Sequence, residues 1–522
     1  MKLRNIVFIF TILAFGASSV FAEQWQILGT RPMGMGGAFV GMAKGPIAQY
    51  WNPAGLYKDN NTSGLEIPVG IGVELTGDIM ENASKIGELA DDFSSIQAAQ
   101  TGGTAVDAKE IAAFVKTLAL MSDMNDPGNG ALFEIAGGVN LKLSKIAVSI
   151  NNFTAAGVTP FIDTVNVGLD SGAGGINMGA STTTIVGMDS TQRAAATTMA
   201  SAIDVIGFSD LENLMCGSAG CLNTQSSITT PAELANALIQ QDLAVTGAAL
   251  TEAANAMLEY ATEAAPIIDA VAGGKDYTNN NSNLTVEGAA FTEIAFGMAK
   301  PIWIDGLLIG GNIKMVNGRV GYSTFQFMQE ESGTTDAFDD FDSNTEDSWK
   351  PALDLGFLMQ LNKRWANLPM NPRVGLVIRN LNAPKFDKPT TAVAAGKGSS
   401  YQLDRQMRMG FAISPANFWH LALDMDLTKN DTPVDGFKSR QLSMGTEINI
   451  FNKSWINIPL RAGMIKNMAE SDSKMSYTAG LGFNLIHFNV DVTGMMSSDT
   501  TEIEGDDVPR KLSGAVSIGL LF

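Results

Sequence analysis

The sequence predicts an all-β membrane protein, a 14-stranded antiparallel transmembrane β-barrel with helical extracellular insertions. Three observations carry this prediction: an export signal at the N-terminus, a repeated alternation of apolar and polar side chains, and connections that alternate between short and long. Strands that face lipid on one side and a polar interior on the other have this two-residue period. Outer-membrane barrels join such strands by short periplasmic turns and longer external loops.

The N-terminus has the three parts of a bacterial signal peptide. Lys2 and Arg4 precede an apolar run over residues 6–15, and small side chains at Val20 and Ala22 predict cleavage after Ala22. The apolar run is shorter than the roughly 20 residues that a helix needs to span a bilayer. We therefore expect residues 1–22 to be removed and the mature chain to reside in the bacterial outer membrane, in contact with its lipid and lipopolysaccharide.

The composition agrees with an exported barrel and argues against a nucleic-acid partner. The mean hydropathy is +0.09 although the chain has 54 glycines, and loss of Lys2 and Arg4 takes the net charge from −20 to −22. Nucleic acid would repel such an acidic chain. The only cysteines, Cys216 and Cys221, lie in the stretch CGSAGC, and an oxidising compartment favours a disulfide between them over free thiols.

The alternation is clearest near the C-terminus. In residues 475–485, apolar side chains from Tyr477 to Leu485 share one face, and polar or glycine residues share the other. The same pattern, extended over the chain, gives fourteen strands at about 64–77, 131–143, 146–158, 284–300, 307–328, 349–361, 371–382, 404–413, 419–429, 438–450, 456–467, 475–485, 487–498 and 509–522. The connections after even-numbered strands are short, so the barrel region 61–522 returns both of its ends to the periplasm.

Two long connections, at about 78–130 and 159–283, read as helical insertions. In 107–121, Asp107 is placed to cap a helix with Glu110 three residues on, and in 230–262 Thr230, Pro231 and Glu233 form a similar start. The expected buried face of this second helix comprises Leu234, Leu238, Leu250, Met257 and Leu258. These helices either shield the barrel rim or admit a ligand, and the sequence leaves both open.

Residues 28–56, LGTRPMGMGGAFVGMAKGPIAQYWNPAGL, resemble the N-terminal signature of the FadL-like superfamily of outer-membrane transporters for hydrophobic compounds. They are more similar still to the conjugal-transfer TraF-type outer-membrane barrel family. RVGLVIRNLNAPKFD at 373–387 and the segments PLRAGMIKN and YTAGLGF within 459–483 support the resemblance. It implies that residues 23–60 fold inside the barrel as a plug, with an Asn-Pro-Ala stretch at Asn52, Pro53 and Ala54.

The residues themselves are compatible with a plug. Gly34, Gly36 and Gly37 permit tight turns close to wall side chains. Tyr50 and Trp51 are aromatic side chains that should not stay in water. The glycine run is not a phosphate loop, because no strand precedes it and the third glycine of the GxGxxG pattern is missing.

Charged residues alternate with apolar ones on the expected lumen face: Asp354, Arg379, Arg408, Asp424, Asp426, Glu447, Arg461 and Asp491. They either line a selective path or pair with one another to hold the wall behind a plug, and we favour pairing. With a turn centred near Ala416, we expect Arg408 and Asp424 to be cross-strand neighbours. The acidic loop 329–347 favours a solvated external loop over a dedicated calcium site, because the turn glycine and the closing glutamate are missing.

No catalytic residue, metal site or cofactor is predicted. The two histidines, His420 and His487, lie near expected strand starts, and neither a GxSxG nor an HExxH motif occurs. The resemblance makes passive transport of small hydrophobic compounds, with an apolar ligand bound above the plug, the first hypothesis. The alternative is a non-transport component of a conjugation or secretion system, and an enzyme is the least supported. The terminal Phe522 resembles a recognition signal for the barrel assembly machinery.

Overall fold

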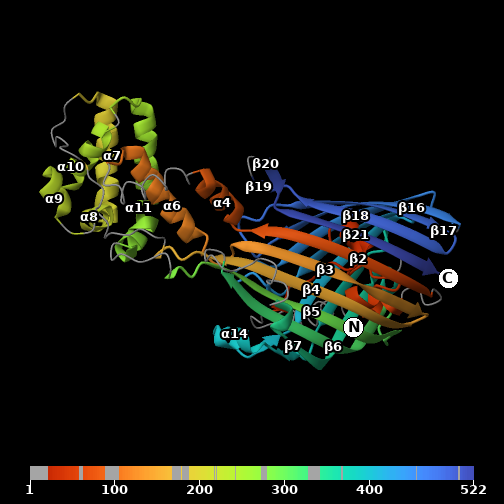
Figure 1. The fold of residues 1–522 in the computed structure, drawn as a ribbon. Helices are drawn as coiled ribbons and strands as arrows, with labels where there is room; N and C mark the ends of the chain where they lie inside the picture. The colour runs from red at the N-terminus through yellow and green to blue at the C-terminus, as the bar shows by residue number, and fades with distance from the viewer. Residues whose placement is uncertain are drawn as a thin grey trace.

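The computed structural model describes residues 22–57, 63–88, 105–166, 178, 187–216, 218, 220–241, 243–271, 279–326, 341–365, 368–453, 455–503 and 506–522. The expected signal peptide and most of the acidic loop 329–347 lie outside these residues. Fourteen strands close into a barrel, and a helical bundle projects from one end of it (Figure 1). The fold class predicted from the sequence is confirmed.

The barrel follows chain order throughout. Its strands are β2 (Gly64–Thr76), β3 (Gly130–Leu143), β4 (Ile146–Phe161), β5 (Asn283–Pro301), β6 (Leu307–Gln326), β7 (Thr345–Gln360), β8 (Arg373–Arg379), β11 (Gln406–Ala416), β12 (Trp419–Asp426), β15 (Gln441–Ile450), β16 (Ile456–Asn467), β17 (Ser476–Leu485), β18 (Phe488–Ser497) and β21 (Lys511–Leu521). Each pairs antiparallel with its neighbours, and β21 pairs with β2 to close the ring. Closure satisfies the backbone of every strand, as a strand in lipid requires.

The connections give the two ends of the barrel different characters. Six short connections and both ends of the strand ring, where Gly64 pairs with Leu521, lie at one end, which we call the turn end. One of these connections holds the short helix α13 (Leu361–Arg364). The longer connections, with the helical bundle, lie at the opposite loop end. This is the alternation of short and long connections that the sequence predicted.

The outside of the barrel is apolar. On β2, Val69 and Ile71 are 56% and 61% exposed, whereas Gly70 and Gly72, which alternate with them, face inward. On β21, Leu512, Val516 and Ile518 are likewise exposed while Ser513 and Ser517 are buried. Apolar side chains that repeat outward around a closed barrel form the surface that lipid requires. Separately, none of the described helices combines the length and apolar character needed to cross a membrane.

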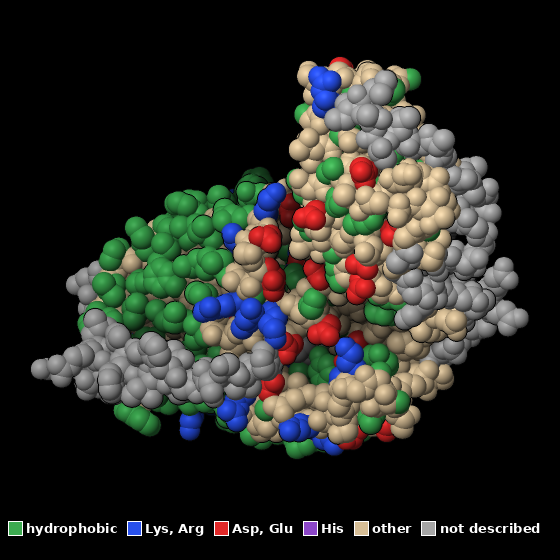
Figure 2. All heavy atoms as spheres, turned by 90° about the vertical axis from the view of Figure 1, so that its left-hand side faces the viewer, with side chains coloured by type: hydrophobic (Ala, Val, Ile, Leu, Met, Phe, Trp, Pro, Cys, Tyr) green, Lys and Arg blue, Asp and Glu red, His purple; other side chains and the backbone are tan. Residues whose placement is uncertain are grey.

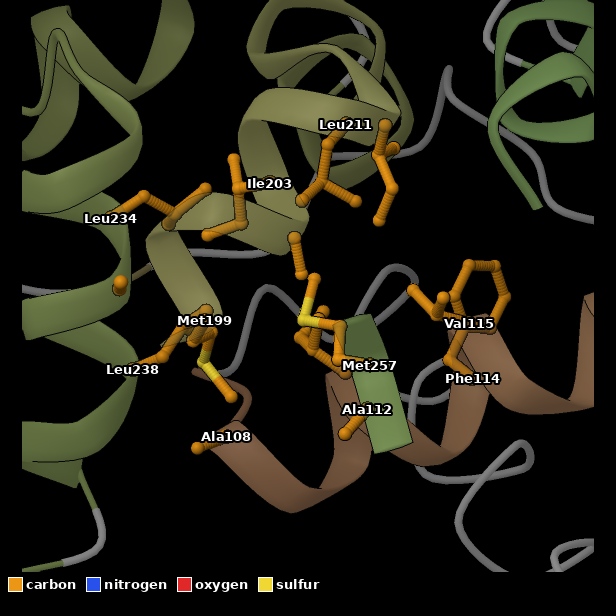
Figure 3. Packing of buried hydrophobic residues seen from close by; sticks show 14 of the residues in the cluster. Ala108, Ala112, Phe114, Val115, Met199, Ile203, Leu211, Leu234, Leu238 and Met257 are labelled. Atoms are coloured by element: carbon orange, nitrogen blue, oxygen red, sulfur yellow. The ribbon is translucent and has the colours of Figure 1, made fainter. Parts of the chain in front are cut away.

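The bundle at the loop end is a second hydrophobic unit assembled from both insertions. Helices α4 (Ile79–Glu88) and α6 (Ala108–Asp123) come from the first insertion. Helices α7 (Ser190–Ile206), α8 (Phe208–Cys216), α9 (Cys221–Ser226), α10 (Pro231–Gln241) and α11 (Gly247–Val271) come from the second. Figure 3 shows side chains of α6, such as Ala112, meeting Met199 and Met257 from the second insertion.

Both predicted helix starts are confirmed, and at the second the amide of Glu233 donates to Thr230 Oγ1 at 3.2 Å. Asp107 accepts hydrogen bonds from the amides of Lys109 and Glu110, which completes the expected capping box. The predicted single helix over 230–262 is wrong: α10 ends at Gln241 and α11 begins at Gly247. Leu258, expected in the buried face, is 40% exposed, because the buried stripe of α11 runs through Leu250, Ala254, Met257 and Ala261 and Leu258 lies about 100° around the helix from Met257. Cys216 and Cys221 are joined by a disulfide between α8 and α9.

A hydrogen-bonded neck ties the bundle to the barrel. Asn125, after α6, exchanges two hydrogen bonds with the backbone of Ile162, at 2.9 and 2.6 Å. Asp163 donates its amide to Ser282 Oγ at 2.8 Å and accepts from the amide of Asn281 at 3.0 Å. The three chain segments that pass between the barrel and the bundle are thus hydrogen-bonded to one another where they leave the barrel.

Short elements fill or border the loop end. They are β9 (Lys385–Asp387) with β10 (Ser400–Gln402), α14 (Thr390–Ala394), β13 (Asn430–Asp431) with β14 (Lys438–Ser439), and the hairpin β19 (Thr500–Ile503) with β20 (Asp506–Pro509). Phe386, in β9, packs on Phe291 of β5 with ring centroids 5.1 Å apart. These elements place an aromatic cluster inside the loop half of the barrel.

Candidate functional site

The N-terminal segment, residues 24–57, lies inside the barrel. It comprises α2 (Thr30–Gly34), α3 (Ala48–Trp51) and the 3-10 helix η1 (Pro53–Tyr57), and it follows β1 (Ala22–Glu23), which pairs with β13. Nearly all of its side chains are buried, and α2 packs against β16, β17, β18 and β21. Residues 24–57, most of the segment for which the sequence resemblance implies a plug, are thus bound within the barrel.

Glycine is required where this segment meets the wall. Gly36 has a φ of +65°, and a Cβ there would lie 2.5 Å from the carbonyl oxygen of Met464 on β16. Gly37 also has a positive φ, of +87°, and a Cβ on Gly34 would lie 3.0 Å from Arg461 Cβ. A side chain at Gly36 would push the segment off the wall, so this glycine sets how closely the two can approach.

Ion pairs anchor the start of the segment. Arg31 donates from Nε and from Nη2 to the two carboxylate oxygens of Glu447, both at 2.7 Å. Arg461 donates to Glu447 at 2.8 Å and to Asp491 at 2.5 Å. The arrangement binds one segment arginine into a wall network of two carboxylates and a second arginine. Such charge-assisted pairs are the stronger class of hydrogen bond.

Asp424 holds the middle of the segment through its backbone. Its Oδ2 accepts the amides of Phe39 and Val40, both at 2.7 Å. Thr478 Oγ1, on β17, contacts the amide of Gly36 and the carbonyl of Gly34, each at 3.1 Å. Wall side chains thus satisfy backbone groups that the segment, having little regular structure, cannot satisfy itself.

The predicted partnership of Arg408 and Asp424 is wrong, although both side chains are buried in the barrel. Arg408 pairs in register with Asp426 and donates to it at 2.6 Å, and Asp424 pairs with Gly410. The connection is centred one residue later than expected. This moves each partner by two positions, which keeps every side chain on its face.

The Asn-Pro-Ala stretch closes the segment against β6 and β7. Asn52 Nδ2 donates to the carbonyl oxygen of Phe357 at 2.9 Å, and Asn52 Oδ1 accepts the amide of Ala54 at 3.2 Å. A Cβ on Gly356 would lie 2.3 Å from Asn52 Oδ1, and one on Gly310 would lie 2.4 Å from Pro53. Two wall glycines therefore make room for this turn.

An aromatic cluster, stacked on wall arginines, completes the anchorage. Trp25, Tyr50 and Trp51 pack on one another, with centroids 5.6 to 6.0 Å apart. Arg408 lies 4.6 Å from the Trp25 ring, and Arg379 lies 4.1 Å from the Tyr50 ring. Buried cation–π contacts of this kind contribute about 2 kcal/mol each. The cluster explains how two buried arginines are tolerated in the lumen.

Sequence reasoning missed part of the charge network. Lys314 on β6 contacts Glu293 and Asp354, both at 3.0 Å, and Arg379 contacts Glu293 at 2.9 Å. Glu293 and Lys314 occupy inward positions of their strands, so the two-residue alternation contained the signal needed to find them. Ser414 Oγ lies 2.8 Å from His420 Nδ1, but Arg373 donates to the same hydroxyl oxygen, which opposes its use as a nucleophile.

The described residues also show how the acidic loop is paired and how potential metal ligands are arranged. In the described part of the acidic loop, Asp342 pairs with Arg319 at 2.7 Å. Within the described residues, no group of three or more His, Cys, Asp or Glu side chains is arranged to hold a metal ion.

Two larger cavities lie at the ends of the barrel, on either side of the N-terminal segment. The loop-end cavity, of about 660 Å³, lies between the bundle and the rim, and its lining includes seven carboxylates against three basic side chains. Figure 2 shows acidic side chains gathered beside the bundle on this face. The turn-end cavity, of about 460 Å³, is lined by Arg31, Lys44, Glu66 and Phe522 among others. The lumen between them holds small cavities of about 20 to 30 Å³.

A closed β-barrel with an apolar outer surface and a segment of its own chain bound in the lumen has the fold of outer-membrane β-barrels. The family model described as "F plasmid transfer operon, TraF, protein" matches residues 49–426, so the chain belongs to this family.

Solved structures similar to the chain include the Ralstonia pickettii toluene transporter TbuX, with 10% identity, 95% and 98% of the two chains covered and a TM-score of 0.41. The Pseudomonas putida toluene transporter TodX has 9% identity, 96% and 98% coverage and a TM-score of 0.38. A Pseudomonas aeruginosa FadL homologue has 7% identity, 96% and 99% coverage and a TM-score of 0.38. No curated protein matches the chain.

Proposed function

We propose that this protein is a plugged outer-membrane transporter that lets small molecules cross passively when its N-terminal segment shifts. The observation that carries the proposal is the separation of two end cavities, of about 660 and 460 Å³, by that one segment. The segment is held by polar and charged contacts rather than by continuity with the sheet. It can therefore leave the lumen without disturbing the hydrogen bonds between strands.

The orientation follows from the connections. Outer-membrane barrels keep their short turns and both chain ends in the periplasm, so the turn end is the periplasmic side and the bundle is external. In this orientation the loop-end cavity is the entrance, and the turn-end cavity is the exit.

Small hydrophobic compounds are the substrate class that the sequence resemblance implies. The polar lining of the loop-end cavity does not suit them, whereas the aromatic cluster of Phe291, Phe386 and Tyr401 inside the barrel does. An apolar solute would therefore have to reach that cluster by moving β9 and β10. Comparing toluene uptake with uptake of a small cation by cells that carry the protein tests this part of the proposal.

Deleting residues 31–56 tests the transport proposal. The anchored segment is then lost, while the strands from β2 onward remain, and we expect the ion conductance of the inserted barrel in planar bilayers to rise well above that of the intact protein. Heat-modifiable migration in gel electrophoresis checks that the variant is inserted. Unchanged conductance, together with loss of a periplasmic partner detected by crosslinking, would instead make the segment a docking arm and remove the case for transport.

A non-transport role is the second candidate, because the bundle has its own core and a fastened neck. Its longest helix, α11, presents Glu252, Glu259 and Glu263 outward, so the external face is acidic. In this role the barrel anchors a surface module of a conjugation or secretion system. Removing residues 167–278 would then abolish the cellular function, and the conductance of the barrel would remain as it was.

A further inference from the structure

Small cavities lead inward from the loop-end cavity along β2 and β21. The loop-end cavity shares Glu74 and Lys511 with a cavity of about 20 Å³, whose lining also includes Gln24 and Gln441. That cavity shares Gln441 and Lys511 with a third, of about 30 Å³. The third is lined by Gln26, Met33, Glu134 and the inward glycines of β2. Through these shared lining residues the three cavities follow one another from the barrel mouth to its middle, and we call this row of cavities the file.

Unpartnered polar atoms indicate that this file holds water. Gln24 and Gln26 are 5% and 4% exposed, and Gln24 Oε1 and both amide atoms of Gln26 have no protein partner. Glu134 Oε1 also has none. Buried polar atoms are nearly always hydrogen-bonded, and a cavity above about 15 Å³ holds a water molecule. Water in the small cavities satisfies these atoms.

The file ends at Met33. A Cβ built on Gly70 of β2 would lie 3.6 Å from the Met33 terminal methyl group, so this side chain covers the wall at that level. Just beyond it, Thr30 Oγ1 and Ser517 Oγ are 2.6 Å apart, and Ser517 pairs with Pro68. Glu66, the next inward residue of β2, already lines the turn-end cavity. Four strand residues, about 13 Å, separate the two open regions.

The charges along the file favour cations. Glu74 pairs with Lys511 at 2.6 Å, and Lys474, which also lines the file, pairs with Asp499 at 3.3 Å, so the Glu134 carboxylate is left without a salt bridge of its own. The carboxylates and basic groups of the turn-end cavity balance: Arg31, Lys44 and Arg461 face Glu66, Glu447 and Asp491. Charge selection is therefore set inside the file and not at its exit.

We propose that Met33 closes a path for water and small monovalent cations that runs along β2 and β21 from the loop-end cavity to the turn-end cavity. The inference rests on the proposed function, since it names the route and the ionic preference of the plugged barrel. It places the inner end of the file at Met33, so a local shift of this side chain and of the Thr30–Ser517 contact beyond it opens the path without release of the whole segment.

Substituting Met33→Ala tests the seal, with Met35→Ala as the matched control. Met35 is an equally buried methionine of the same segment, but it packs against Gly445 and lines none of these cavities. We expect the M33A variant to conduct at least tenfold more than the wild type in KCl, with K⁺ preferred over Cl⁻. The M35A variant should stay at the wild-type level. Adding Glu134→Gln to the M33A variant should lower the K⁺ preference.

A second variant tests whether position 33 lies in the path without relying on the volume of the Met33 side chain. In Met33→Cys, reaction with a small cationic methanethiosulfonate should abolish the residual current, because the thiol would lie in the path. The inference is overturned if M33A conducts like the wild type, if M35A conducts as much as M33A, or if Cl⁻ is preferred. Conduction after deletion of 31–56 without conduction in M33A would overturn this inference alone. If neither the deletion of 31–56 nor M33A conducts more than the wild type, the proposed function is overturned as well.

Discussion

Replacing Glu447 by alanine should release the N-terminal segment locally. The carboxylate accepts two hydrogen bonds from Arg31 and one from Arg461, at 2.7 to 2.8 Å. Breaking a buried ion pair by removing one partner costs about 3–5 kcal/mol. Arg31 is 15% exposed and can regain water, and Arg461 keeps Asp491, so we take the lower value of about 3 kcal/mol. This corresponds to a roughly 100-fold larger population of the released segment.

Hydrogen exchange of the segment measures this population. The amides of Phe39 and Val40 donate to Asp424 only while the segment is docked, so their exchange in E447A should be about 100-fold faster. Glu287→Ala is the control, because Glu287 forms a 2.7 Å pair with Lys388 in the loop-end half of β5. Unchanged exchange in E447A, or equal acceleration in E287A, would refute the view that the Glu447 network holds the segment.

Three further predictions concern the bundle and its neck. Burial raises the pKa of Asp163, but hydrogen bonds from Asn166 and nearby amides outweigh it and leave the pKa below its ordinary value of 3.8. The carboxylate therefore stabilises the neck above about pH 4 and ceases to as the pH falls through the lowered pKa, so exchange of residues 279–283 should accelerate only in acid. Reducing the Cys216–Cys221 disulfide should lower bundle stability by about 2 kcal/mol in a denaturant titration with and without reductant. Met257→Ala should cost about 2–5 kcal/mol in the same titration and Leu258→Ala less than about 1 kcal/mol, and equal costs would contradict the burial of Met257 and the exposure of Leu258.

The strand pattern was predictable because each barrel strand has one neighbouring strand on either side, an apolar environment at its outer face and the polar lumen at its inner face. Lipid requires apolar side chains outward, so a residue such as Val516 reports its own orientation without knowledge of its neighbours. Strand positions and the alternation of connections therefore follow from the chain alone. The inward positions of Glu447 and Arg461 follow by the same rule.

Partners inside the lumen were harder to predict, because they depend on register and on a segment distant in sequence. The pairing of Arg408 with Asp426 rather than Asp424 turns on a one-residue shift in a connection that includes an irregularity between Ile413 and Ala416. The amides of Phe39 and Val40 carry no sequence signal for Asp424, since any residue has an amide. Only the two-residue period of Glu293 and Lys314 offered a signal that sequence reasoning could have used.

The bundle could be predicted as helices but not as an assembly. Apolar spacing locates α6 and α10, yet nothing in either stretch says that α6 of the first insertion packs among helices of the second. The end of α10 at Gln241 and the start of α11 at Gly247 were missed because both stretches are alanine-rich and share a helical period. Packing of Leu250 and Met257 in the shared core decides which face of α11 is buried.

The shared core of α6 with α7, α10 and α11 makes the bundle a discontinuous domain, interrupted in sequence by the β3–β4 hairpin. No single cut of the gene excises it, and grafting it onto another barrel would need two insertion points on either side of a hairpin of matching length. Evolution faces the same constraint: gain or loss of the whole bundle requires two coordinated events. Relatives that carry one insertion without the other should therefore be rare, and their remaining helices should need a different covering surface.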